Sequence, residues 1–148
     1  MKVYELPAET KAATGFTHKA VIDHTDLTET TADTDQTIEL LAVAAGDFVE
    51  KAAFKLVTTF EDSDDTNLND TQVSIGDGAD PDRFITATQV NENGTEVYYK
   101  TSVPTVPYAY TAADTIDILV ESMSAKSLSD IDAGELNVFL SIQKVSAL

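Results

Sequence analysis

The residues of this chain best suited to chemistry lie in the stretch 73–90, which reads VSIGDGADPDRFITATQV. It sets Asp77, Asp80 and Asp82 around two glycines and a proline, followed by Arg83, the only arginine of the chain. Carboxylate oxygens are the ligands that Ca²⁺ prefers, but an EF-hand loop needs acids at alternate positions, a central glycine and a closing glutamate. The spacing here does not match that pattern, so an acidic turn is favoured over a calcium loop.

A second acidic loop, EDSDDTNLND at 61–70, offers Asp62, Asp64 and Asp70 but lacks the glycine. Aspartate and glycine are also common in plain turns, because the aspartate side chain bonds local amides and glycine tolerates positive φ. We therefore favour a turn here too. In the first loop we expect Arg83 to pair with a neighbouring aspartate, as an exposed ion pair worth at most about 1 kcal/mol.

The two histidines, His18 and His24, do not assemble a catalytic set. His24 lies between Asp23 and Asp26, where it could serve a metal or an acid–base step. His18 shares its parity with apolar neighbours, and neither histidine has an activated nucleophile nearby in sequence. The glycines form no phosphate-binding motif, and the absence of cysteine excludes thiolate chemistry. We expect a protein that is not an enzyme, with no catalytic residue, no cofactor and no bound metal.

Aromatic and apolar residues in unusual places are the better candidates for function. Four tyrosines gather in EVYYK at 96–100 and VPYAYT at 106–111. They could be interface anchors, core residues or platforms for sugars, and the sequence leaves these alternatives open. Two further apolar residues interrupt the polar sides of otherwise clean alternations. The expected contact residues are Tyr98, Tyr108, Tyr110, Leu119 and Phe139.

β-Strands must position these residues, because the sequence alternates with period two. In ELNVFLSIQ at 135–143, one face receives Leu136, Val138, Leu140 and Ile142, and the other is polar apart from Phe139. Such alternation is typical of half-buried antiparallel strands. Together with the turn signals between the runs, it predicts about eight strands, at 16–23, 36–43, 48–60, 71–76, 83–87, 95–101, 115–122 and 135–145.

Eight such strands predict an all-β fold. We expect an antiparallel β-sandwich with jelly-roll-like connections, with an immunoglobulin-like sandwich as the second choice. The sequence AAGD at 44–47 indicates a tight hairpin, and 124–131 a single helical turn. Residues 1–15 are expected to form an irregular N-terminal arm before a single β-sandwich domain at 16–148.

The charge of the chain limits its partners. The formal net charge is −17, from 26 acidic and 9 basic residues. Phosphate backbones and anionic membranes repel such a surface, so we expect no nucleic-acid partner and no membrane partner. No run of the sequence has the length of a membrane span. A basic protein surface or a bound cation would be compatible with the charge.

Three stretches, from Val21 to Ile142, carry a resemblance to a known class of proteins. They read VIDHTDLTETTADTDQTIELLAVAAGDFVEKAAFKLVTTFED, VSIGDGADPDRFITATQVNENGTEVYYK and AYTAADTIDILVESMSAKSLSDIDAGELNVFLSI. They resemble head decoration, or cement, proteins and other small virion structural proteins of tailed bacteriophages. The resemblance implies a jelly-roll-like sandwich, often trimeric, that binds the major capsid protein on the outer capsid surface and strengthens the shell. It supplies no functional residues to carry over.

A different class of function remains open beside this one. A β-sandwich of a head fibre or tail could bind a glycan or a receptor, with tyrosines stacking on sugar and an acidic loop holding calcium. The absence of tryptophan weakens the sugar reading. A small enzyme is the least favoured class, because no nucleophile, base or metal set can be assembled from the sequence.

Overall fold

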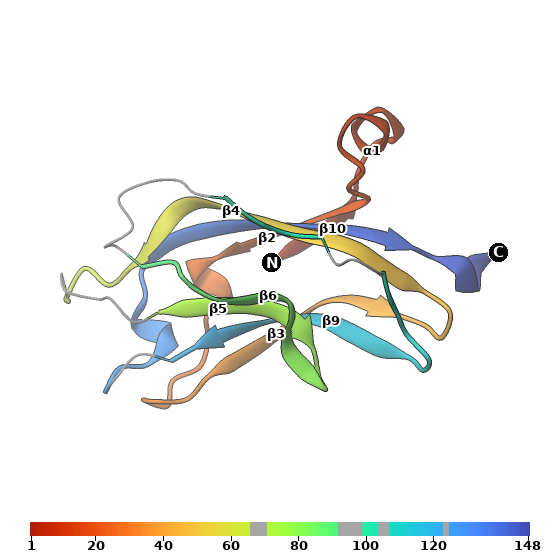
Figure 1. The fold of residues 1–148 in the computed structure, drawn as a ribbon. Helices are drawn as coiled ribbons and strands as arrows, with labels where there is room; N and C mark the ends of the chain where they lie inside the picture. The colour runs from red at the N-terminus through yellow and green to blue at the C-terminus, as the bar shows by residue number, and fades with distance from the viewer. Residues whose placement is uncertain (66–70, 92–98, 104–106, 123–124) are drawn as a thin grey trace.

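The computed structural model describes residues 1–65, 71–91, 99–103, 107–122 and 125–148, and their strands form two sheets that face each other (Figure 1). The six-stranded sheet has the order β1 (Lys2–Glu5), β2 (His18–Asp23), β10 (Ala133–Gln143), β4 (Phe48–Glu61) and β7 (Tyr99–Ser102), and β8 (Tyr108–Ala109) also pairs with β4. The four-stranded sheet has the order β3 (Gln36–Val43), β9 (Asp114–Glu121), β5 (Gln72–Asp77) and β6 (Asp80–Gln89). All pairs of named strands are antiparallel.

The strand order is that of a jelly roll. The eight strands expected from the sequence correspond to β2, β3, β4, β5, β6, β7, β9 and β10. Numbered in that order, the first, eighth, third and sixth lie side by side in one sheet, and the second, seventh, fourth and fifth in the other. This alternation between sheets produces the nested Greek keys of the fold. The predicted all-β antiparallel sandwich is therefore confirmed.

Several details differ from the expectation. Residues 1–15 are not an irregular arm, because β1 pairs with β2 and the connection between them contains the helix α1 (Ala8–Thr14). β8 is a further short strand outside the eight that were predicted, and β6 begins three residues earlier than predicted. The first four residues of the strand predicted at 95–101 lie outside the described residues. The helical turn predicted at 124–131 contains a short 3-10 turn, Leu128–Asp130.

The sequence AAGD does not make a hairpin. It joins β3 to β4, which belong to different sheets, so the chain crosses here from one layer of the sandwich to the other. Gly46 has φ 93°, which a side chain would disfavour, and the Asp47 carboxylate accepts a hydrogen bond from the Ala44 amide at 3.0 Å. The position of the turn was predicted correctly. The prediction that its two flanking strands pair as a hairpin was wrong, because a tight turn can also join strands of different sheets.

The core lies between the sheets, as the alternation predicts. Leu136, Val138, Leu140 and Ile142 are all buried, Leu140 with only 2 % of its surface exposed. They belong to one continuous apolar cluster that also contains Phe54 of β4 and Ile118 of β9. Each inward residue of β10 has an outward neighbour, because successive side chains of a strand point to opposite faces. Of the outward residues, Phe139 is half-buried, whereas Asn137 and Ser141 are covered.

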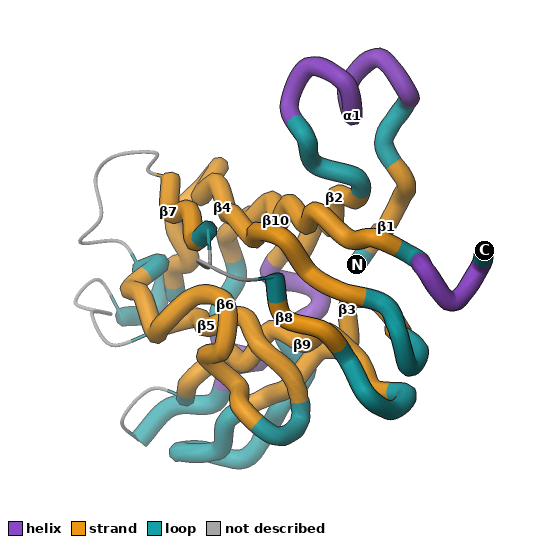
Figure 2. Tube along the Cα trace, turned by 45° about the vertical axis from the view of Figure 1, so that its right-hand side comes forward, coloured by secondary structure: helices purple, strands orange, loops and turns teal. Residues whose placement is uncertain are grey.

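Helix α1 projects from the sandwich beyond β1 and β2 (Figure 2). It has seven residues, none of them buried, and it ends at Gly15, whose φ of 72° gives the left-handed cap that glycine favours. No described helix is long and apolar enough to cross a membrane. A helix this short has little stability of its own, so its position depends on the few contacts that hold it against the sheet.

Candidate functional site

The acidic stretch at 73–90 forms a hairpin, β5–turn–β6, held by a buried ion pair. The Asp77 carboxylate is 2 % exposed and accepts hydrogen bonds from Arg83 Nε at 2.5 Å and Nη2 at 3.2 Å. The amides of Ala79 and Asp80 donate to the same carboxylate at 3.1 and 3.0 Å. The predicted pairing of Arg83 with a neighbouring aspartate is confirmed. The predicted exposure is wrong, because the turn folds over the Asp77 side chain.

Tyr110 completes the surroundings of this carboxylate. Its hydroxyl donates to Asp77 Oδ2 at 3.2 Å, and the tyrosine is only 4 % exposed. Burial and the nearby Asp77 charge raise the Tyr110 pKa above its ordinary value. Burial opposes ionisation of Asp77, but the hydrogen bonds from Arg83 and the two amides outweigh it and lower the Asp77 pKa. A carboxylate engaged in this way has a structural role and is not free to bind a cation.

Of the tyrosines expected to be contact residues, Tyr110 lies in the core and Tyr108 lies partly in it. Tyr110 is buried and cannot present its ring to a partner. Tyr108 is half-buried, with the Arg83 guanidinium 4.0 Å from its ring centre and Phe84 and Tyr110 packed edge-on against it. Tyr98 lies outside the described residues. Of the alternatives left open for these tyrosines, Tyr110 therefore takes the core one, and Tyr108 keeps only part of its ring at the surface.

Two lysines hold buried aspartates in a similar way. Lys126 Nζ lies 2.8 Å from Asp62 Oδ2, in the second acidic loop, and its hydrogen bond is the main cause of the lowered Asp62 pKa. Asp47 accepts hydrogen bonds from Ser146, which lower its pKa to about 2, and Lys144 lies 3.7 Å away. Among the described residues, no group of three or more histidine, cysteine or acidic side chains is arranged to hold a metal ion. Arg83, Lys126 and Lys144 thus act as fixed partners of buried acids.

Most other lysines lie on the outer side of the six-stranded sheet. Cross-strand partners share a face, and the outward Phe139 is paired with Lys19 on β2 and with Ala53 on β4. The next row joins Lys2, Val21, Asn137 and Lys55. We call this surface the lysine face, and it consists of Lys2, Tyr4, Lys19, Val21, Lys51, Ala53, Lys55, Asn137 and Phe139.

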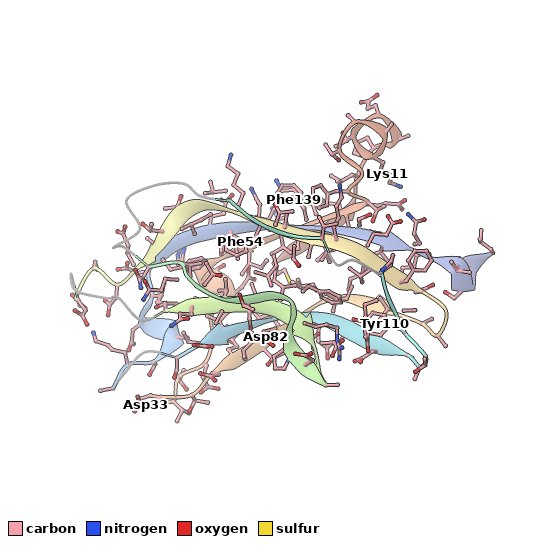
Figure 3. All side chains as sticks on the ribbon, in the orientation of Figure 1. Lys11, Asp33, Phe54, Asp82, Tyr110 and Phe139 are labelled. Carbon is pink, nitrogen blue, oxygen red and sulfur yellow. The ribbon has the colours of Figure 1, made fainter. Side chains whose placement is uncertain are left out.

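An apolar groove lies between the lysine face and α1. It has a volume of about 290 Å³ and is lined by Leu6, Thr10, Thr14, Phe16, Ala53, Phe54, Thr101 and Phe139. The rings of Phe16 and Phe139 lie 5.8 Å apart, and the small Ala53 beside Phe139 leaves the groove its depth. Figure 3 shows Phe139 on the α1 side of the sheet and Phe54 between the sheets. The outward phenylalanine that the sequence singled out is therefore part of a formed groove.

Lysines surround the groove and fix its helical wall. Lys51 Nζ donates to the Thr14 carbonyl at the end of α1 at 2.8 Å and lies 4.3 Å from the Phe16 ring centre. A cation at a helix C-terminus is favourable because the last carbonyls carry partial negative charge. Lys19 Nζ lies 5.8 Å from the Phe139 ring centre, and Lys11 of α1 pairs with Glu5. The groove thus joins an apolar floor to a cationic rim.

The outer side of the four-stranded sheet has the opposite charge. We call it the acidic face, and it consists of Thr37, Glu39, Gln72, Ser74, Gly76, Asp117, Leu119 and Glu121, as the cross-strand pairs show. The hairpin turn lies against Gly76, where an added Cβ would come 2.1 Å from the Asp80 carbonyl oxygen. Asp117 is 8 % exposed beneath this turn, and its Oδ1 accepts no hydrogen bond within the described part of the chain. Burial, followed by the charges of Glu39, Asp114 and Asp77, raises the Asp117 pKa.

The structure separates the two apolar residues that the sequence grouped together. Phe139 belongs to the lysine face and Leu119 to the acidic face, so one partner surface cannot meet both. His18 is half-buried in β2, where burial lowers its pKa, and His24 starts a 3-10 turn. Sequence reasoning missed Phe16 and α1 as parts of the groove. Nothing local signals them, because Phe16 meets Lys51 and Phe139 only through the tertiary fold.

Comparisons with known proteins found similarity of fold only. No protein-family model and no curated sequence matches the chain. A chain of the structure titled "Cyanophage Pam1 capsid asymmetric unit" superposes with a TM-score of 0.58 at 15% identity, over 82% of this chain and 79% of that chain. A chain of "Acidic stable capsid structure of Helicobacter pylori bacteriophage KHP30" covers 95% of this chain and 90% of its own at 12% identity, with a TM-score of 0.42. The second value is too low to support an argument.

Proposed function

We propose that this chain is a structural protein of a bacteriophage virion, and specifically a decoration protein on the outer surface of the capsid. The observation that carries the proposal is the likeness of its jelly roll to a chain of the Pam1 capsid asymmetric unit, over about four-fifths of both chains. The stretches from Val21 to Ile142 that resemble decoration proteins support the same class. The major capsid protein is the proposed partner.

The chemistry of the described residues supports a role that is not enzymatic. The aspartates best placed for a site, Asp77 and Asp62, are held by Arg83 and Lys126 within the fold. Tyr110, whose hydroxyl donates to Asp77, is buried. Binding to a symmetric shell requires no reactive group, because many weak contacts at repeated positions add up to a stable attachment.

The net charge favours the outer surface of the shell. With −17 formal charges, the chain would be repelled by packaged DNA on the inner surface. On the outer surface the same charge keeps the particle soluble. The outer position is therefore part of the proposal.

Co-sedimentation with capsids that lack the protein tests the proposed function. The probe is the empty shell assembled from the major capsid protein of the phage genome that encodes this chain. We expect the purified chain to sediment with these shells and to raise their melting temperature. A chain that remains in the supernatant at all salt concentrations would remove the decoration function. A glycan array with and without Ca²⁺ would then test the receptor-binding alternative.

We also propose that the chain forms a homotrimer. Subunits of this charge repel one another at low ionic strength, so an oligomer must bury enough apolar surface to offset the repulsion. Association should therefore strengthen as salt screens the charge. Light scattering at low and high salt measures the mass, and a monomer under both conditions would contradict the trimer.

A further inference from the structure

On the outer side of the six-stranded sheet, the lysine face and α1 leave an apolar groove and a helix uncovered in the single chain. Helix α1 has only seven residues and none is buried, although short helices usually depend on packing for stability. The groove beneath it is open and apolar, and its volume of about 290 Å³ lies near the lower end of the range for ligand pockets. An apolar groove next to an uncovered helix is the arrangement expected of a docking surface.

The charges of the strands single out the same surface. The strands of the six-stranded sheet carry five lysines and five acids, so they are neutral overall. Four of these lysines belong to the lysine face, and of the acids Asp23 and Glu135 lie in the same outward register. Those of the four-stranded sheet carry one arginine and seven acids, which gives a net charge of −6. That arginine, Arg83, is already paired with Asp77. Within the described sandwich, only the lysine face offers an acidic partner a cluster of cations without a surrounding excess of acids.

From these observations we infer that the chain docks through the lysine face and α1 onto an acidic protein surface, which inserts an apolar side chain into the groove. This inference rests on the proposed function and makes the partner the outer surface of the shell protein. Lys2 and Lys19 of the lysine face meet the partner's carboxylates, and Phe16 and Phe139 contact its apolar side chain. The acidic face then points away from the shell.

A second copy of this chain fits the groove less well. Its acidic face has the complementary charge, but the two faces lie on opposite sides of the sandwich (Figure 1). A contact between opposite faces repeats as an open stack and does not close into a ring. Nucleic acid is a further occupant for a cationic surface, but the whole chain would repel its phosphates.

Three variants of the proposed surface test the inference in the co-sedimentation assay. Phe139→Ala removes part of the groove floor, and Thr10→Trp fills the groove from the helix. The double variant Lys2→Gln/Lys19→Gln removes two cations from the lysine face. The matched control is Thr37→Glu/Ala87→Glu, which makes the same change of −2 in net charge at exposed positions of the four-stranded sheet. Circular dichroism establishes that each variant is folded.

We expect Phe139→Ala and Thr10→Trp to weaken binding to shells by about thirtyfold, as for central apolar contacts. The double lysine variant should weaken binding by about tenfold at low salt and less at high salt, while the control binds like the wild type. Wild-type binding with no loss in any of the three groove and rim variants would overturn the inference and leave the proposed function standing. Failure of the wild type itself would overturn the function. If the chain instead binds linear DNA, the occupant of the groove would be nucleic acid and not the shell. If the chain forms stacks that the lysine variants abolish, the occupant would be a second copy of this chain.

Discussion

The two outer faces of the sandwich are built from the same kind of strand but present different chemistry. On the lysine face, cations surround a pair of phenylalanines and an open groove. On the acidic face, Asp117 lies under a hairpin turn among further acids, and no described residue of that face is basic. A formal charge of −17 is therefore not a uniform property of the surface, because four lysines gather on one face of the sandwich and the described residues of the acidic face include none.

The basic residues explain how this difference arises. Arg83, Lys126 and Lys144 are each placed beside a buried aspartate, where they stabilise turns and chain ends. On the lysine face, by contrast, Lys19 and Lys51 lie over aromatic rings at the surface. Basic side chains thus pair with buried acids in one region and lie beside an apolar groove in the other.

The largest expected effect on stability distinguishes an inward side chain of the six-stranded sheet from an outward one. Leu140→Ala should lower the free energy of unfolding by about 2–5 kcal/mol, because it leaves a cavity in the core. Its neighbour Phe139 points outward, so Phe139→Ala should cost only about 1 kcal/mol, the size of an aromatic pair. Denaturant unfolding of both variants measures the difference. Equal losses would mean that Phe139 is part of the core and not of a docking surface.

The second comparison sets a structural cation against a surface cation. Arg83→Ala leaves the Asp77 charge buried without its main partner and should destabilise the protein by about 3 kcal/mol. Lys2→Ala on the lysine face, at an exposed position, should change stability by less than about 0.5 kcal/mol. The double variant Asp77→Asn/Arg83→Met removes both charges and should recover part of the loss. A large effect of Lys2→Ala in unfolding experiments would contradict the assignment of Lys2 to a surface role.

The pH dependence of stability should differ between the buried carboxylates. The folded-state pKa values of Asp47, Asp62 and Asp77 are lowered, that of Asp47 to about 2. Their stabilisation is present above the ordinary aspartate pKa near 3.8 and is lost as the pH falls from there toward 2. Unfolding curves between pH 7 and pH 2 should therefore show a steep acid loss, which Asp47→Asn should make shallower.

Asp117 should act in the opposite direction, with a smaller effect. Because its pKa is raised in the fold, its charged form destabilises the protein once the pH is above that raised pKa, and protonation relieves the cost. Asp117→Asn should thus increase stability at pH 7, by at most about 1 kcal/mol, and change it little below the ordinary aspartate pKa. A variant that is less stable at pH 7 would show that the acidic face does not strain this carboxylate.

The smallest expected effect concerns calcium. The Asp77 and Asp62 carboxylates are engaged by Arg83 and Lys126, so neither acidic loop should require a metal ion. Thermal melts in EDTA and in millimolar Ca²⁺ should coincide, because a ligand raises the melting temperature only when it binds the folded state. A melting temperature several degrees higher in Ca²⁺ would contradict this prediction and indicate that one of the acidic loops binds the ion.

Much of the fold could be predicted because its signals are local. Alternation along β10 correctly placed its four inward residues, and the acidic turn between β5 and β6 was read from aspartate and glycine chemistry. The short β1 and α1 were missed, since four residues are too few to show a period and α1 buries nothing. The candidate site was predicted only through Phe139, because its apolar character on a polar face is visible in one strand.

The sequence by itself determined which residues face the core, where the chain turns and how strongly acidic the protein is. Only the tertiary structure decided that Phe16 and Phe139 share a groove, that Asp62 meets Lys126, and that Asp47 meets Ser146. These pairs lie 123, 64 and 99 residues apart. The physical reason is that the side-chain period of a strand is a property of neighbouring residues, whereas the neighbours of a strand in a jelly roll are set by how the whole chain closes its two sheets over one core.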